Sequence, residues 1–126
     1  MHRSKLAGFI IDCRGDDPRA AAAFWSAALG MEQQLLPGVE GERYVRLLDG
    51  QHGLHVEVQA VEHASRVHLD IETDDIEAEV ARLEALGARR IGQVQSWCVM
   101  QAPSGQRFCV VRRCTAAFDA VANRWP

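Results

Sequence analysis

The chain has 126 residues, of which 48% are hydrophobic and 25% charged, with a formal net charge of −3. This length predicts a single domain with one core. The acidic balance and the lack of a basic stripe argue against nucleic-acid binding. No apolar run is long enough to cross a bilayer or to form a secretory signal. We therefore expect a cytoplasmic protein that binds neither nucleic acid nor membrane.

The four cysteines, Cys13, Cys98, Cys109 and Cys114, lack the paired spacing of a zinc finger or a redox motif. Three of them lie inside runs that are expected to be strands, where a reduced cysteine behaves as a small apolar residue. No disulfide is expected.

The elements expected along the chain form two similar series, each a strand, a helix and three further strands. The first series begins with a strand at 6–13 and a helix that Asp17 can cap, with Pro18 at its first position. Gly30 can adopt the left-handed conformation that ends a helix. Helical spacing predicts a buried stripe of Ala21, Phe24, Trp25 and Ala28. Strands are expected at 32–36, 42–48 and 54–59.

The second series begins with a strand at 66–72, followed by a helix that Asp74 can cap, with Glu77 three residues later. The apolar seam of this helix is expected at Ile76, Val80 and Leu83, and Gly87 ends it. Strands are expected at 89–94, 96–101 and 107–112. In the tail, Phe118, Val121 and Trp125 have near-helical spacing, which predicts a short helix packed on the body or on a partner chain.

Alternation along the expected strands separates an apolar face from a polar one, because successive side chains point to opposite faces. The apolar faces should meet the helices. The polar faces then collect histidines, carboxylates and an arginine from distant parts of the chain: His55, Glu57 and Gln59; His68, Asp70 and Glu72; Arg107 and Cys109. A half-solvated antiparallel sheet alternates in the same way without any function. For Trp97, both core packing and an aromatic wall of a ligand site remain open.

Three motifs occur in order along the chain: AFWSAALG at 23–30, VHLDIETDD at 67–75 and APSGQRFC at 102–109. Together they resemble the vicinal oxygen chelate superfamily, and more narrowly its glyoxalase-like and bleomycin-resistance-like members. The resemblance implies an α+β fold of two paired βαβββ modules, at about 6–60 and 66–113, with a tail at 114–126. Their curved mixed sheet would form a cup that holds the ligand, with the helices on its convex side.

The resemblance also implies a divalent metal held by four residues on the first, fourth, fifth and eighth strands. Aligning the two repeats places Ile10, Glu57, His68 and Cys109 at these positions. Isoleucine cannot coordinate a metal, and cysteine is not the nitrogen or oxygen donor that the family uses there. No cofactor is therefore expected. If a metal is bound, Glu57 and His68 would hold it, and a shifted set of His55, Glu57 and His68 is the alternative.

We expect a glyoxalase-like domain, forming a homodimer, that binds a small organic molecule without the family's four-ligand metal site. His68 and Glu57 are the predicted catalytic or acid–base groups. The predicted ligand-binding residues are His55, Gln59, Asp70, Trp97, Arg107 and Cys109. One alternative is a divalent-metal-dependent lyase, isomerase or dioxygenase. The other is a non-catalytic dimeric interaction module marked by the apolar residues of the tail.

Overall fold

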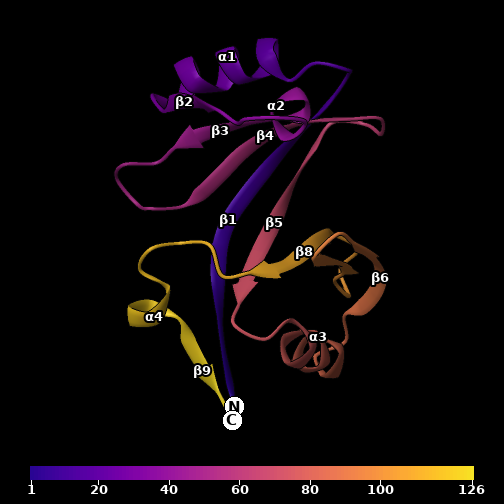
Figure 1. Cartoon of the computed structure of the whole chain (residues 1–126). Coiled ribbons are helices and arrows are strands. Elements are labelled where there is room, and N and C mark those ends of the chain that lie inside the picture. Colours follow the sequence, from indigo (N-terminus) through magenta and orange to yellow (C-terminus); the bar gives the residue numbers. More distant parts are fainter. The chain divides into compact units, whose positions relative to one another are not determined.

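The computed structural model describes all 126 residues, and its elements confirm the α+β class (Figure 1). The contacts within the chain divide it into two compact units. Unit 1 comprises Met1–Gly8 and His68–Pro126, and unit 2 comprises Phe9–Val67. Each unit contains one longer helix and one helix of four residues. No helix in the structure has both the length and the apolar character needed to cross a membrane.

Unit 2 contains the first expected series of elements. Its strands follow the order β2-β3-β4-β1, and β3 is antiparallel to both of its neighbours. Figure 1 shows α1 alongside β2 and β3. The elements are the end of β1 (His2–Arg14), α1 (Arg19–Leu29), β2 (Glu32–Leu35), α2 (Glu40–Arg43), β3 (Tyr44–Leu48) and β4 (His55–Val61). The strand expected at 42–48 thus begins two residues late, because the helical turn α2 occupies its start.

The core of unit 2 lies between α1 and one face of the strands. Its buried members are Ile11, Ala22, Val45, Leu47, Val56 and Val58. The buried stripe predicted for α1 is only partly right. Ala21 and Trp25 pack against the core, but Ala22 is the fully buried residue and the Phe24 side chain is exposed. Several consecutive alanines precede Phe24, so the apolar pattern alone did not fix the rotation of this helix.

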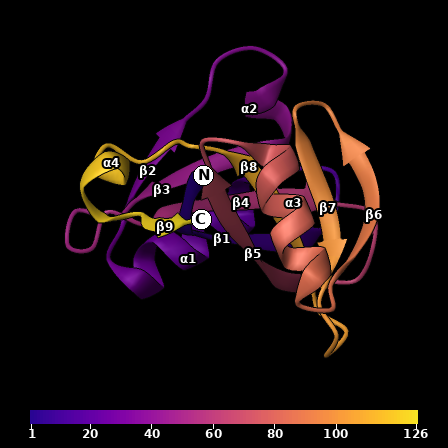
Figure 2. The ribbon, with the colours of Figure 1, turned by 90° about the horizontal axis from the view of Figure 1, so that it is seen from below.

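Unit 1 contains the second series and both chain ends. Its strands follow the order β1-β5-β8-β7-β6, with β5 and β8 parallel, β7 antiparallel to both β8 and β6, and β9 antiparallel to β1. Figure 2 shows α3 beside β7 and β8. The elements are the start of β1, β5 (Arg66–Thr73), α3 (Ile76–Ala85), β6 (Arg89–Val94), β7 (Trp97–Gln101), β8 (Arg107–Arg112), α4 (Phe118–Val121) and β9 (Asn123–Trp125).

The core of unit 1 settles which face of each strand the helix α3 covers. Val80 and Leu83 of the predicted helical seam pack with Cys98, Met100, Phe108 and Val110, and Ile71 lies against them. Trp97 therefore does not share the face of Cys98. The prediction that all apolar residues of β5 are covered was wrong, because Leu69 is 51% exposed and Val67 is 60% exposed.

The residues predicted to cap the two helices, Asp17 and Asp74, are not the N-cap residues in the structure, which are Pro18 and Asp75. Asp17 accepts a hydrogen bond from the Arg19 amide (2.9 Å), although α1 begins after Pro18. At α3 the N-cap is Asp75, whose side chain accepts from the Ala78 amide. Asp74 instead accepts from the backbone and side chain of Arg3. The sequence pattern does not distinguish Asp74 from Asp75 as the cap of α3. The hydrogen bonds from Arg3 occupy the Asp74 carboxylate, and Asp75 caps the helix.

The tail is not the single helix that its spacing predicted. It consists of the short helix α4 followed by β9, whose residues pair with His2, Arg3 and Ser4 of β1. Phe118 is fully buried, whereas Val121 is 59% exposed. Glu72 holds the start of the tail by accepting hydrogen bonds from the amides of Cys114 and Thr115. The tail thus packs on its own unit.

Candidate functional site

Three predicted site residues of unit 1 come together on the face of the strands that is turned away from α3. Asp70 of β5 is paired with Cys109 of β8 in the parallel register, so their side chains share one face. His68 lies two residues earlier along β5, on the same face. The ligand-type atoms of His68, Asp70 and Cys109 all lie within 4.8 Å of one another.

The carboxylate of Asp70 is the most unusual group in this cluster. Asp70 is 7% exposed, and its Oδ1 atom is buried with no hydrogen-bond partner. The His68 Nε2 atom lies 3.4 Å from this oxygen, close enough for an ion pair but without hydrogen-bond geometry. A buried carboxylate oxygen without a partner is costly, so it marks a place where a cation or donor group would bind favourably.

The surrounding face combines apolar and polar side chains. Val99 of β7 is paired with Cys109, and Trp97 lies two residues further along the same face. The Arg107 side chain donates a hydrogen bond to Gln101 (3.1 Å). Of the residues predicted in unit 1, His68, Asp70 and Cys109 form one cluster. Arg107 lies at the end of β8 and is hydrogen-bonded to Gln101.

Unit 2 brings together its own predicted residues, on the face of β4 opposite the core. His55 Nε2 lies 3.1 Å from Glu57 Oε1, and both side chains are more than four-fifths buried. This contact makes His55 and Glu57 a hydrogen-bonded pair on that face. Gln59 donates instead to the hydroxyl of Tyr44 (2.9 Å).

Two residues on this face of unit 2 were missed by the sequence analysis. Arg46 is paired with Glu57 across β3 and β4, and its Nε atom is buried without a hydrogen-bond partner. Asp12 is 1% exposed and forms an ion pair with Arg66 (3.6 Å). Alternation from Ile10 could have revealed Asp12, because Phe9, Ile11 and Cys13 pack against the core. Ile10 is itself buried, at 3% exposure.

The cysteines divide by environment, and none forms a disulfide. Cys98 lies in the core of unit 1, where burial raises the pKa of its thiol, and burial likewise raises the pKa of Cys13. A raised pKa disfavours the reactive thiolate at both of these cysteines. Cys109 is the cysteine that lies beside a histidine and a carboxylate.

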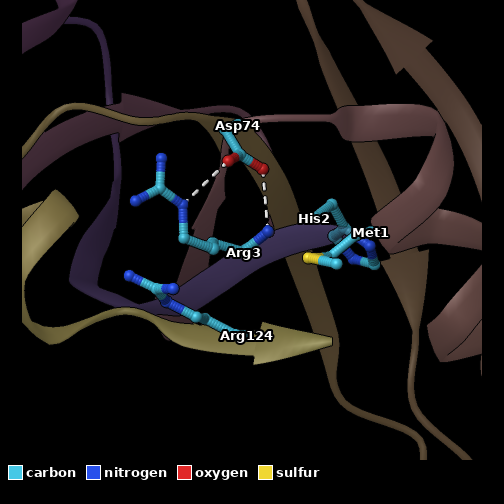
Figure 3. Close-up of a pocket in the computed structure, with 5 residues that line it drawn as sticks. All are labelled: Met1, His2, Arg3, Asp74 and Arg124. Carbon is cyan, nitrogen blue, oxygen red and sulfur yellow. Dashed lines mark hydrogen bonds and ion pairs between the residues drawn. The ribbon is translucent and has the colours of Figure 1, made fainter. Parts of the chain in front are cut away.

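A separate pocket lies at the chain ends of unit 1 and is lined by Met1, His2, Arg3, Asp74 and Arg124 (Figure 3). Figure 3 shows the Asp74 carboxylate turned toward Arg3, whose amide and Nε both donate to it, at 2.8 and 3.1 Å. The carboxylate that would bind a ligand here is thus already paired. None of the predicted site residues lines this pocket.

The donor set of the unit 1 cluster fits one class of metal better than others. Imidazole, carboxylate and thiolate are all zinc ligands, whereas Mg²⁺ and Ca²⁺ prefer oxygen donors only. The buried Asp70 Oδ1 atom has no hydrogen-bond partner, so a cation at the cluster would be favourable for it. His68, Asp70 and Cys109 are the residues that would hold it. A bound zinc ion would act there as a Lewis acid.

Solved structures with the same fold share little sequence with this chain. A hypothetical protein from Bacillus halodurans C-125 is 11% identical, with a TM-score of 0.62 over 88% of this chain and 95% of the other. Methylmalonyl-CoA epimerase from Mycobacterium tuberculosis is 13% identical, with a TM-score of 0.62 over 86% and 89%. A variant of the Streptomyces coelicolor epimerase, in complex with 2-nitronate-propionyl-CoA, is 14% identical, with a TM-score of 0.54 over 89% and 97%.

None of the curated proteins matches this chain significantly. The family comparison is decisive, because the model of the glyoxalase-like domain matches residues 8–111. That range contains both strand-helix-strand series and the clusters of polar side chains described above. The expected resemblance is thereby confirmed: the chain belongs to the family of glyoxalase-like domains.

Proposed function

We propose that this domain binds a small organic molecule on the polar face of unit 1, with His68 and Asp70 as its main polar anchors. The observation that carries the proposal is the buried Asp70 oxygen, which has no hydrogen-bond partner inside the protein. A ligand hydroxyl, amine or amide that donates to this oxygen would remove the cost of leaving it unpaired.

The neighbouring side chains support a ligand that is partly apolar. Val99 and Trp97 lie on the same face as Cys109, and small-molecule sites combine apolar walls with a few polar anchors. Arg107 offers a cation at the end of β8. In unit 2 we propose the hydrogen-bonded His55–Glu57 pair as a second acid–base group, and Gln59 as a further polar contact.

The proposal does not use the family's four-residue metal site. One of the four corresponding positions is Ile10, whose side chain is buried and offers no donor atom. Glu57, at another of these positions, is already hydrogen-bonded to His55. The polar side chains themselves therefore provide the binding groups of the proposed site.

Ligand binding can be tested by NMR titration of the chelator-treated protein. The probes are methylmalonyl-CoA, chosen because epimerases share the fold, and a library of small carbonyl and hydroxy compounds. We expect shifts centred on residues 68–70 and 107–109. The variant His68→Ala should weaken binding about 5- to 150-fold, which corresponds to about 1–3 kcal/mol for an unpaired buried group.

The matched control is His52→Ala, because the His52 side chain is 70% exposed in a turn. This variant should bind as the wild type does. Shifts that avoid β5 and β8, or equal affinities for His68→Ala and wild type, would contradict the proposed site.

A second candidate is an isomerase-type activity, which the contact between His68 and Asp70 favours. A histidine beside a carboxylate is a common general acid–base arrangement. The assay is the exchange of the α-hydrogen of methylmalonyl-CoA for deuterium in D₂O, followed by NMR. Exchange that is faster than without protein and lost in His68→Ala would support the activity. Binding of methylmalonyl-CoA without exchange would contradict the isomerase-type activity and support a domain that only binds its ligand.

A further inference from the structure

We propose that Arg46 binds the carboxylate group of a small organic acid on the polar face of unit 2. The site lies wholly within unit 2, on the face of β3 and β4 that is turned away from the core. The inference goes beyond the proposed function, which takes its main anchors from unit 1 and does not use Arg46. It assigns a ligand class, carboxylates with a single negative charge, to this second group of side chains.

The first observation is a buried guanidinium nitrogen without an acceptor. The Arg46 Nε atom is buried, and no group of the protein accepts a hydrogen bond from it. Leaving a buried donor unpaired is costly, and an acceptor on a bound ligand would remove that cost. Arg46 as a residue is only partly buried, and its exposed part is the side chain because β3 lies between β2 and β4. A ligand can therefore reach the guanidinium group.

The carboxylate best placed to neutralise Arg46 is bonded elsewhere. Glu57 is paired with Arg46 across β3 and β4, a position in which opposite charges commonly interact. No ion pair joins these two side chains, and Glu57 Oε1 instead contacts His55 Nε2 at 3.1 Å. On the other side of β3, Arg46 is paired with Gln34 of β2, which carries no charge. The positive charge of Arg46 is thus left without a direct contact to a carboxylate of the protein.

A second buried atom without a partner lies on the same face. His55 Nδ1 is buried and makes no hydrogen bond. In the register of β3 and β4, His55 is diagonal to Arg46, which separates the two residues by about 7–8 Å. Leu48 is paired with His55, and 36% of this apolar residue is exposed. Two unsatisfied polar atoms and an exposed apolar side chain therefore share one face, as in sites for small organic molecules.

The packing of unit 2 determines the direction in which Arg46 projects. Its neighbours in the sequence, Val45 and Leu47, are both fully buried in the core of the unit. Because successive side chains of a strand point to opposite faces, Arg46 must project from the face opposite the core. Sites on strands hold their side chains more precisely than sites on loops.

Donor geometry and local charge decide which anion is preferred. A guanidinium group offers two parallel N–H donors, which match the two oxygens of a planar carboxylate. Inorganic phosphate also accepts from arginine, but it carries more than one negative charge near neutral pH. On this face it would lie close to the Glu57 carboxylate, whose side chain is only 15% exposed. Repulsion between like charges in partly buried surroundings disfavours the more highly charged anion, so we expect a carboxylate.

The test is an NMR titration of the ¹⁵N-labelled full chain at constant ionic strength. The probes are propionate, its neutral analogue propionamide, and inorganic phosphate. We expect propionate to produce saturable shifts of the Arg46 Nε–H signal and of the backbone amides of residues 46 and 57. A dissociation constant on the order of 1–10 mM is expected for a ligand of so few atoms. Propionamide should leave the Arg46 signal unchanged, and phosphate should bind more weakly than propionate.

Two arginine variants assign the site. Arg46→Met should weaken propionate binding at least tenfold, because it removes both the charge and the paired donors. The matched control is Arg19→Met in the same unit, because the Arg19 side chain is 76% exposed, and this variant should bind propionate as the wild type does.

Urea denaturation of Arg46→Met separates a ligand-binding role from a structural one. An arginine that has no partner in the protein contributes no contact that methionine would lose, so the variant should unfold at the wild-type urea concentration or above it. A clear loss of stability would show that Arg46 supports the fold, and it would contradict the inference.

Three titration results would also overturn the inference: no saturable shift of the Arg46 signal in the wild type, tighter binding of phosphate than of propionate, or equal affinities of Arg46→Met and Arg19→Met. The positions of the shifts separate this inference from the proposed function. Ligand shifts at residues 68–70 without a response of Arg46 to propionate refute only the carboxylate site. A response of Arg46 to propionate without any ligand binding at residues 68–70 refutes only the proposed function.

Discussion

Replacement of Glu79 by glutamine should destabilise the protein far more than the same change two residues away. Glu79 lies on α3 with its side chain fully buried, and one oxygen accepts from His2 Nε2 at 2.8 Å. Arg82 donates two further hydrogen bonds of 2.8 Å, from Nε and Nη2. The Arg82 guanidinium in turn stacks on Trp125 of β9, 3.8 Å from the ring centroid. This carboxylate thus links α3 to both ends of the chain.

The magnitude follows from these contacts. Hydrogen bonds to a charged group contribute about 1.5–3 kcal/mol each, and glutamine keeps one acceptor oxygen of the two. The Arg82 side chain is 25% exposed, so in the variant water replaces part of the hydrogen bonding that Arg82 loses. We expect Glu79→Gln to lower the free energy of unfolding by about 2–4 kcal/mol, measured by urea denaturation with a midpoint shift of about 1–2 M.

Glu77→Gln is the matched control on the same helix. The Glu77 side chain is 74% exposed, and its partner Arg90 is 41% exposed. Water solvates both groups, so this variant should unfold at the wild-type urea concentration. Equal destabilisation by the two substitutions would refute the assignment of a buried ion-pair network to Glu79.

The same variant has a predicted pH dependence. Burial by itself would raise the pKa of Glu79, but hydrogen bonds from Arg82 and His2 outweigh it and place the pKa below its ordinary value. The folded state therefore favours the ionised form. The resulting stability is fully present above the ordinary pKa of about 4.3 and is lost as the pH falls through the folded pKa. The gap between wild type and Glu79→Gln should narrow below about pH 4, and an unchanged gap would contradict the shift.

Three further substitutions test other parts of the fold. Glu72→Gln should increase hydrogen–deuterium exchange around Thr115, because Glu72 accepts hydrogen bonds from the Thr115 amide and hydroxyl; unchanged exchange would show that other contacts hold the tail. Phe118→Ala should lower the unfolding free energy by about 3–5 kcal/mol, while Val121→Ala, at a residue 59% exposed, should change it little; equal losses in denaturation would contradict a tail packed on its own unit. Gly30→Ala should lower the unfolding free energy by about 1–2 kcal/mol in the same assay, because Gly30 has a φ of 68° and alanine is strained there. No other atom crowds the new methyl group, so unchanged stability would contradict the strain.

The sequence predicted helix ends and strand bounds well where a residue type, such as glycine at a helix end, favours a single backbone conformation. Gly30 ends α1 with a φ of 68°, and the strands Arg89–Val94 and Arg107–Arg112 have the expected bounds. Period-two alternation placed His68, Asp70 and Cys109 on polar faces. These features depend on backbone geometry over a few consecutive residues. That geometry is the same wherever the segment lies in the fold.

What the tertiary structure decided depends on partners far away in the sequence. Asp74 is bonded to Arg3 instead of capping α3, and β9 pairs with the first residues of the chain instead of continuing a helix. The parallel register that sets Asp70 beside Cys109, 39 positions later in the sequence, is likewise absent from any local pattern. Alternation determined which side chains share a face. Only strand order and register, set by packing over the whole unit, determined which of them lie within bonding reach.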